Sequence, residues 1–170
     1  MILTRFDRWD WVVSLSLALA VGVVIMATSH LVGLVRDEGF YMRAAEVTAD
    51  YLQFSIDRIA GGDFTAPFSD KTIRRYFEFN SEHPTFVKNL FGLSYFVFHK
   101  KLQVLSFVKS IRLVAALFAA ATAFLLYLFG RLFFSRTVAI AAPFLFFMMP
   151  HQFFHSHLAC FDIPSLFFWS

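Results

Sequence analysis

The chain has little charge for its size. Charged residues make up 16% of its 170 residues, well below the roughly 25% of a soluble domain. Hydrophobic residues make up 58%, and the mean hydropathy is +0.62. A soluble single domain is therefore nearly excluded, and the composition predicts an integral membrane protein.

Cysteine and blocks of basic charge are also scarce. The single cysteine, Cys160, excludes both a disulfide framework and a cysteine zinc site, and its apolar context predicts a small buried hydrophobic residue. The chain has 15 basic and 12 acidic residues without a polybasic block. We therefore predict no nucleic-acid partner.

Three apolar stretches and the start of a fourth predict membrane spans. Residues 11–35 contain no Lys, Arg, Asp or Glu. At about 1.5 Å per residue, a helix of this length exceeds the roughly 30 Å hydrocarbon core. The remaining spans are expected at residues 112–134, 138–158 and 163–170. The last is cut short, so residues 1–170 are interpreted as the N-terminal part of a longer, all-α, polytopic protein.

Two features qualify this set of spans. A signal peptide is the alternative for the first span, but its apolar region would normally be only about 7–15 residues long. Pro143 and Pro150 predict that the third span is broken or short. Membranes tolerate such breaks where protein covers the freed backbone or where it lines a cavity.

Residues 36–111 form the first long loop, which is expected to carry amphipathic helices at the membrane interface. Apolar residues recur at a spacing close to 3.6 over residues 39–60, and a second helix is predicted at about 84–100. Arg131 and Arg136 flank a short connection, which the positive-inside rule places in the cytoplasm. The N-terminus is then also cytoplasmic, and the long loop lies outside.

Acidic residues directly follow the first span. Asp37 and Glu38 are adjacent, so on a helix their side chains diverge by about 100° and the two are expected to have different roles. Tyr41 shares the face of Asp37. The alternative is a solvated helix start, where carboxylates favour the positive end of the helix dipole.

The other candidate residues are His83, Lys88, Arg112 and Asp162. Lys88 lies near the start of the second loop helix, where an ammonium group could meet a phosphate, although an ordinary surface lysine is the alternative. Arg112 is the first residue of the second span. The alternative interpretation is a snorkelling arginine, whose side chain extends to the membrane interface. Asp162 lies in an apolar stretch. A carboxylate inside a membrane is energetically costly, so we expect Asp162 to have a functional role or a charged partner. The topology brings Asp37, Glu38, His83, Lys88 and Asp162 to one membrane face.

Three histidines invite a metal interpretation. His151 and His155 would share a helix face, but the glutamate of the zinc-protease pattern does not accompany them. Together with His157, they are better interpreted as the polar lining of a cavity near Pro150. We predict no metal site and no cofactor, and a divalent cation requirement stays open.

These residues together resemble the N-terminal part of a GT-C glycosyltransferase of family 39, the dolichyl-phosphate-mannose protein mannosyltransferase and aminoarabinose transferase group. The resemblance covers essentially the whole chain, and the stretch HPTFVK resembles the mannosyltransferase motif HPPLGK, with Thr85 in place of the second proline. The matched elements are D-E-x-x-Y (Asp37, Glu38, Tyr41), H-P-x-x-x-K (His83, Pro84, Lys88), an Arg-led span ending L-Y-L-F-G-R-L-F-F-S, and P-x(11)-D-x-P (Pro150, Asp162, Pro164).

The resemblance implies an enzyme that transfers a sugar, with inversion, from a polyprenyl-phosphate-linked donor to a protein, lipid or glycan acceptor. Transfer would occur on the outer face of a multi-pass protein, with a bacterial inner or plasma membrane as the expected location. By the resemblance, Asp37 is the base that activates the acceptor, and Glu38 supports it. Lys88 and Arg112 would compensate the phosphate charge, and the remaining candidates would contact substrate. The part that completes donor binding would lie beyond this chain.

A transporter fragment or a non-catalytic membrane subunit is the alternative function. Broken helices line substrate paths in transporters, where ionisable residues are expected near mid-span. Here they gather at one face and at loop starts, which favours the enzyme.

Overall fold

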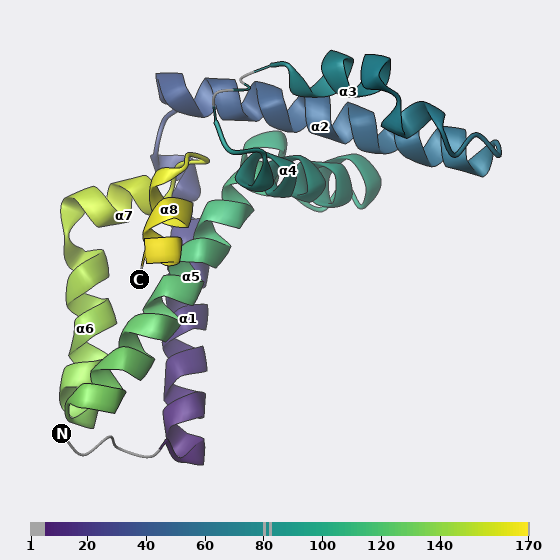
Figure 1. The fold of residues 1–170 in the computed structure, drawn as a ribbon. Coiled ribbons are helices and arrows are strands. Elements are labelled where there is room, and N and C mark those ends of the chain that lie inside the picture. Colours follow the sequence, from purple (N-terminus) through teal and green to yellow (C-terminus); the bar gives the residue numbers. More distant parts are fainter. Residues whose placement is uncertain (1–5, 80, 82, 170) are drawn as a thin grey trace. The chain divides into compact units, whose positions relative to one another are not determined.

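The computed structural model describes residues 6–79, 81 and 83–169, and these residues contain helices but no strand (Figure 1). The chain divides into two compact units. Unit 1 comprises Met1–Gly33 and Ala115–Ser170, and unit 2 comprises Leu34–Val114. Helix α5 (Phe107–Phe133) is continuous and contributes its beginning to unit 2 and the rest to unit 1.

Unit 1 is built on antiparallel packing of α1 against α5. Helix α1 (Arg8–Thr28) is followed by a 3₁₀ turn, η1 (Ser29–Leu31). Gly22 of α1 approaches Ala120 of α5 in the middle of both helices. Three shorter helices complete the unit: α6 (Arg136–Met148), α7 (Pro150–Ser156) and α8 (Asp162–Trp169). The buried core consists of Ile25, Ala116, Ala119, Ala123, Phe147 and Ile163.

Two segments of the described chain are long and apolar enough to cross a membrane. They are Arg8–Leu31, with 24 residues, and Phe107–Phe133, with 27 residues. The predicted third span is a pair of helices, α6 and α7, bent by 77° at a break next to Pro150. The break confirms the prediction of a broken span, because proline lacks the N–H that would continue the α6 ladder.

Unit 2 is a set of helices packed against α2 (Arg36–Ala60). After α2 come η2 (Ala66–Phe68), α3 (Asp70–Phe77), α4 (Thr85–Ser94) and the π-helical segment η3 (Tyr95–Lys101). The contact between α2 and α4 is close, since Ala45, Ala49 and Phe91 are fully buried. A methyl group added at Gly92 of α4 would overlap Thr48 of α2, so glycine is required there.

Several helices of the first long loop begin or end at other residues than predicted. Helix α2 begins three residues before the expected residue 39, so Asp37 and Glu38 lie within its first turn. The predicted helix at 84–100 is divided into α4 and η3. Helix α3 was not predicted; it is short, and it begins where the Ser69 side chain accepts a hydrogen bond from the Thr72 N–H.

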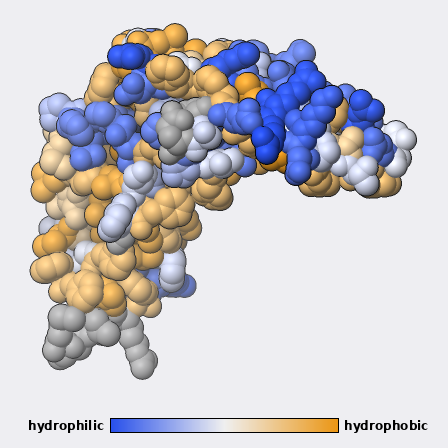
Figure 2. All heavy atoms as spheres, turned by 45° about the horizontal axis from the view of Figure 1, so that its top comes forward, coloured by the Kyte–Doolittle hydropathy of each residue, from blue (hydrophilic) through white to orange (hydrophobic). Residues whose placement is uncertain are grey.

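The two units differ in the character of their surfaces. In Figure 2, hydrophobic residues cover most of the visible surface of unit 1, whereas many hydrophilic residues are visible on unit 2. Large apolar side chains of α1 point outward, for example Leu15 at 60% and Leu19 at 69% exposed. An exposed apolar helix face of this kind fits a lipid environment better than water.

Candidate functional site

A buried ion pair lies at the centre of the candidate site in unit 2. The Arg112 Nε donates to Glu38 Oε1 and the Arg112 Nη2 donates to Glu38 Oε2, both at 2.7 Å. The Glu38 side chain is fully buried and that of Arg112 is 2% exposed. Two parallel charge-assisted bonds fix the orientation of both groups, so the pair joins the start of α2 to the start of α5.

The neighbouring carboxylate has the opposite environment. Asp37 is exposed, whereas Glu38 is buried in the same helical turn. The predicted divergence of the two side chains is therefore confirmed. Because Glu38 is occupied by Arg112, Asp37 is the acidic residue of this pair that is accessible to an incoming molecule.

The predicted aromatic and cationic residues Tyr41, His83 and Lys88 belong to the same unit as this pair. Tyr41 is buried one turn along α2 from Glu38, and its ring meets that of His83 edge-on at 5.7 Å. His83 itself is exposed. Lys88 is 5% exposed and lines a small pocket of about 250 Å³. The ordinary surface lysine considered for this position is thus wrong, since α4 buries Lys88 against α2.

Arg112 does not lie where the sequence predicted it. Helix α5 begins at Phe107, so Arg112 lies in its second turn rather than at its start. A snorkelling interface arginine is also wrong, because the side chain is buried and bonded to Glu38. The residues before Arg112 include Lys109 and Ser110, so the apolar run by itself did not show that the helix extends back to Phe107.

Asp162 belongs to unit 1 and has its own partner there. Its Oδ2 lies 3.1 Å from His155 Nδ1, although the two groups are not aligned as a hydrogen bond. The rings of His151 and His155 lie 4.2 Å apart, as expected for residues one turn apart on a helix. His157 is buried, and its Nε2 lies 2.7 Å from the Thr28 hydroxyl. Within the part of the chain that the structure describes, no three His, Cys, Asp or Glu side chains are arranged to hold a metal ion.

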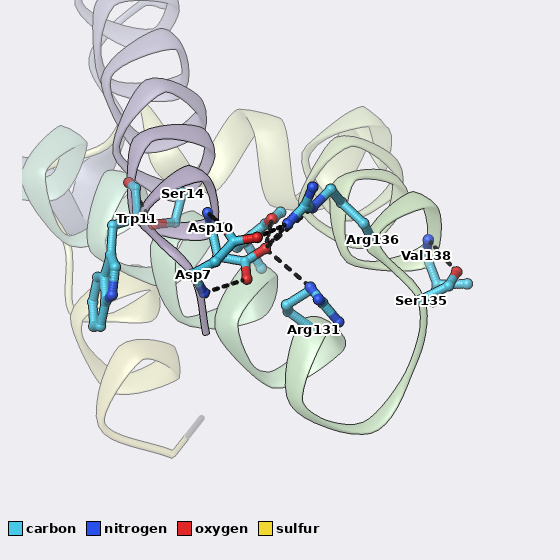
Figure 3. Close-up of polar contacts among 9 residues, drawn as sticks. Asp7, Asp10, Trp11, Ser14, Arg131, Ser135, Arg136 and Val138 are labelled. Carbon is cyan, nitrogen blue, oxygen red and sulfur yellow. Dashed lines mark hydrogen bonds and ion pairs between the residues drawn. The ribbon is translucent and has the colours of Figure 1, made fainter. Parts of the chain in front are cut away.

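A second ionic cluster, in unit 1, was not predicted. The fully buried Asp10 accepts hydrogen bonds at its Oδ1 from Tyr127, Arg131 and Arg136, at 2.8 to 3.2 Å (Figure 3). Arg136 also donates to Asp7 at 2.8 Å. The cluster therefore holds the start of α1 against the end of α5 and the start of α6. Arg131, which flanks the short connection together with Arg136, thus bonds through its guanidinium to Asp10.

The same cluster begins helix α1. Asp7 and Asp10 form a capping box, in which each side chain accepts from the backbone N–H of the other. The backbone N–H of Asp10, together with Arg136, holds the pKa of the Asp7 carboxyl below its ordinary value. Two carboxylates three residues apart at the start of an apolar helix are a local signal for this cap, but their distant arginine partners have no local signal.

Comparisons with known proteins leave the resemblance as a prediction. No family model matches the chain, and neither the curated proteins nor the solved structures give a match. The residues and their geometry are therefore the basis of the functional proposal.

Proposed function

We propose that this chain is the N-terminal part of a polytopic membrane glycosyltransferase of the GT-C type. The enzyme would transfer a sugar from a polyprenyl-phosphate donor to an acceptor, with inversion at the anomeric carbon. The observation that supports this most directly is the different environment of two adjacent carboxylates. Glu38 is buried on Arg112, whereas Asp37 is exposed at the start of α2.

Asp37 has the position of a general base. In the proposed step, the acceptor oxygen or nitrogen attacks the anomeric carbon while Asp37 takes its proton. The bond from that carbon to the phosphate oxygen breaks, and the polyprenyl phosphate leaves with the electron pair. An acceptor hydroxyl or amine requires a positioned base, and an exposed carboxylate supplies one.

Glu38 and Arg112 hold the start of α2 in place. Since Arg112 donates to both Glu38 oxygens, its charge is already compensated inside unit 2. We therefore assign the pair a positioning role and no longer a direct contact between Arg112 and the donor phosphate. Lys88 is the cation that we assign to the leaving phosphate, because it lines a pocket formed by α2, α3 and α4.

The test is a transfer assay on the protein that carries this chain, in membranes supplied with radiolabelled polyprenyl-phosphate sugars. Asp37→Asn is expected to lower turnover by roughly 10²–10⁴-fold while leaving expression unchanged, since loss of a general base has that effect. Asp50→Asn is the matched control: Asp50 is an exposed carboxylate of the same helix, paired with Lys100. It should retain near-normal turnover.

Three results would contradict the proposal. Near-normal turnover of Asp37→Asn at saturating donor and acceptor would exclude Asp37 as the base. Loss of turnover in Glu38→Gln alone, with unchanged folding, would indicate that Glu38 is the base and Asp37 the supporting residue. A protein that transfers none of the supplied sugars but moves them across the membrane would instead be a transporter.

A further inference from the structure

Gly39 is a glycine on an exposed part of helix α2 that packing does not explain. A methyl group added at this position would meet no atom within 4 Å. Glycine is less favourable than alanine inside a helix, and it is often found where a ligand approaches the backbone closely. The open space at Gly39 therefore directs attention to the residues around it.

Those residues form one face of α2. Arg36, Gly39, Phe40 and Arg43 have the spacing i, i+3, i+4, i+7, so they lie on the same side of the helix. Together with Phe79 they line an open pocket of about 550 Å³. Phe40 is 48% and Phe79 is 41% exposed. The pocket thus combines two arginines with two accessible aromatic rings.

We propose that this face binds the phosphate of an anionic phospholipid headgroup. The proposal does not depend on glycosyl transfer. We call the five residues Arg36, Gly39, Phe40, Arg43 and Phe79 the headgroup face.

Charge supports an anionic ligand. A guanidinium group binds phosphate oxygens through parallel N–H groups, and two arginines two turns apart can hold one phosphate between them. One nitrogen of Arg43 donates to Glu46 at 3.1 Å in an exposed pair, which leaves its other N–H groups available to a ligand. Of the first-turn carboxylates, Glu38 is compensated by Arg112, and Asp37 diverges from Arg36 by about 100° around the helix.

Position along the chain supports a lipid as the source of the phosphate. Helix α2 begins five residues after Leu31, the last residue of the first segment that could span a membrane. If that segment crosses the bilayer, Arg36 follows at the depth where the headgroups lie. Exposed aromatic rings beside cationic groups suit this interface, because the rings contact glycerol and acyl carbons while the cations meet the phosphate.

The experiment measures lipid binding to the purified protein that carries this chain, in a non-ionic detergent, by native mass spectrometry. Phosphatidylglycerol and phosphatidylcholine with identical acyl chains are the two probes. We expect tighter binding of phosphatidylglycerol by about tenfold, which corresponds to about 1.4 kcal/mol. Arg36→Gln with Arg43→Gln should abolish this preference and leave phosphatidylcholine binding unchanged.

Gly39→Leu separates the pocket from its charge. This substitution keeps both arginines, and its Cβ meets no atom within 4 Å, so the fold should persist while the side chain occupies part of the pocket. We expect it to weaken phosphatidylglycerol binding as well. Arg74→Gln with Arg75→Gln is the matched control, since it removes the same charge from the exposed surface of α3.

Three outcomes would overturn the proposal. The preference could survive in both the arginine and the Gly39 variants with unchanged helical content. The preference for phosphatidylglycerol could decrease equally in the Arg74→Gln, Arg75→Gln control, which would indicate nonspecific attraction between charges. Inorganic phosphate at the same concentration as the lipid could displace it, which would indicate a site for free phosphate.

Discussion

Glu38 and Arg112 are 74 residues apart in the sequence and are joined by two hydrogen bonds of 2.7 Å inside unit 2. The Glu38 side chain is fully buried, and the exposed fraction of the Arg112 side chain is 2%. A buried charge is costly without its partner, so each residue requires the other. This mutual requirement fixes the first turn of α2, which also carries Asp37.

Breaking the pair from one side should destabilise the protein strongly. Glu38→Gln or Arg112→Met is expected to lower the free energy of unfolding by about 3–5 kcal/mol, because breaking a buried ion pair from one side has that cost. The measurement is denaturant unfolding in detergent, followed by circular dichroism. Glu38→Met combined with Arg112→Met should recover most of the loss, and equal losses in the single and double variants would contradict a coupled pair.

Asp10 should matter more than Asp7 for the stability of unit 1. Asp10→Asn removes a buried carboxylate that accepts from Tyr127, Arg131 and Arg136, so we expect a loss of about 2–3 kcal/mol in unfolding free energy. Asp7 is 52% exposed in its pair with Arg136, and Asp7→Asn should cost much less. Thermal unfolding of the two variants in the same detergent compares them directly. Equal losses would show that helix capping, rather than the buried cluster, stabilises this end.

Two glycines of unit 1 offer a test of helix packing. At Gly130, an added methyl group would lie 2.8 Å from the Ala139 Cα, so α5 and α6 would have to separate. Gly130→Ala is expected to cost about 1–3 kcal/mol, the usual range for overpacking. At Gly22 the nearest atom would be the Ala120 Cβ at 3.5 Å, which is ordinary contact.

Gly22→Ala serves as the matched control for that substitution. Because alanine favours helix over glycine, this variant should be neutral or more stable by up to about 1 kcal/mol. Unfolding curves recorded side by side give the comparison. If Gly130→Ala were as stable as Gly22→Ala, the close approach of α5 to α6 would be contradicted.

The orientation of the chain in the membrane is tested by cysteine labelling. In a Cys160→Ala background, Gly61→Cys should react with a membrane-impermeant maleimide in intact cells. Thr137→Cys should react only after lysis, because the short connection with Arg136 is predicted to be cytoplasmic. Labelling at Thr137 and not at Gly61 would reverse the predicted topology.

Local sequence determined much of this protein. The long apolar segments become α1 and α5, which could each span a membrane, and Pro150 breaks the segment that follows. The different environments of Asp37 and Glu38 also followed from sequence, since adjacent residues on a helix always diverge. These features depend on the residues within one or two helical turns, so the local pattern is sufficient to predict them.

The tertiary structure decided which charges are neutralised. The pairing of Glu38 with Arg112, the burial of Lys88 against α2, and the arginines on Asp10 all join segments that are distant in the sequence. The sequence left an interface arginine open as the alternative for Arg112, because a lone arginine beside an apolar run usually extends toward the headgroups. A carboxylate brought within 3 Å by helix packing reverses that preference, and the periodicity of a single segment carries no information about a partner on another helix.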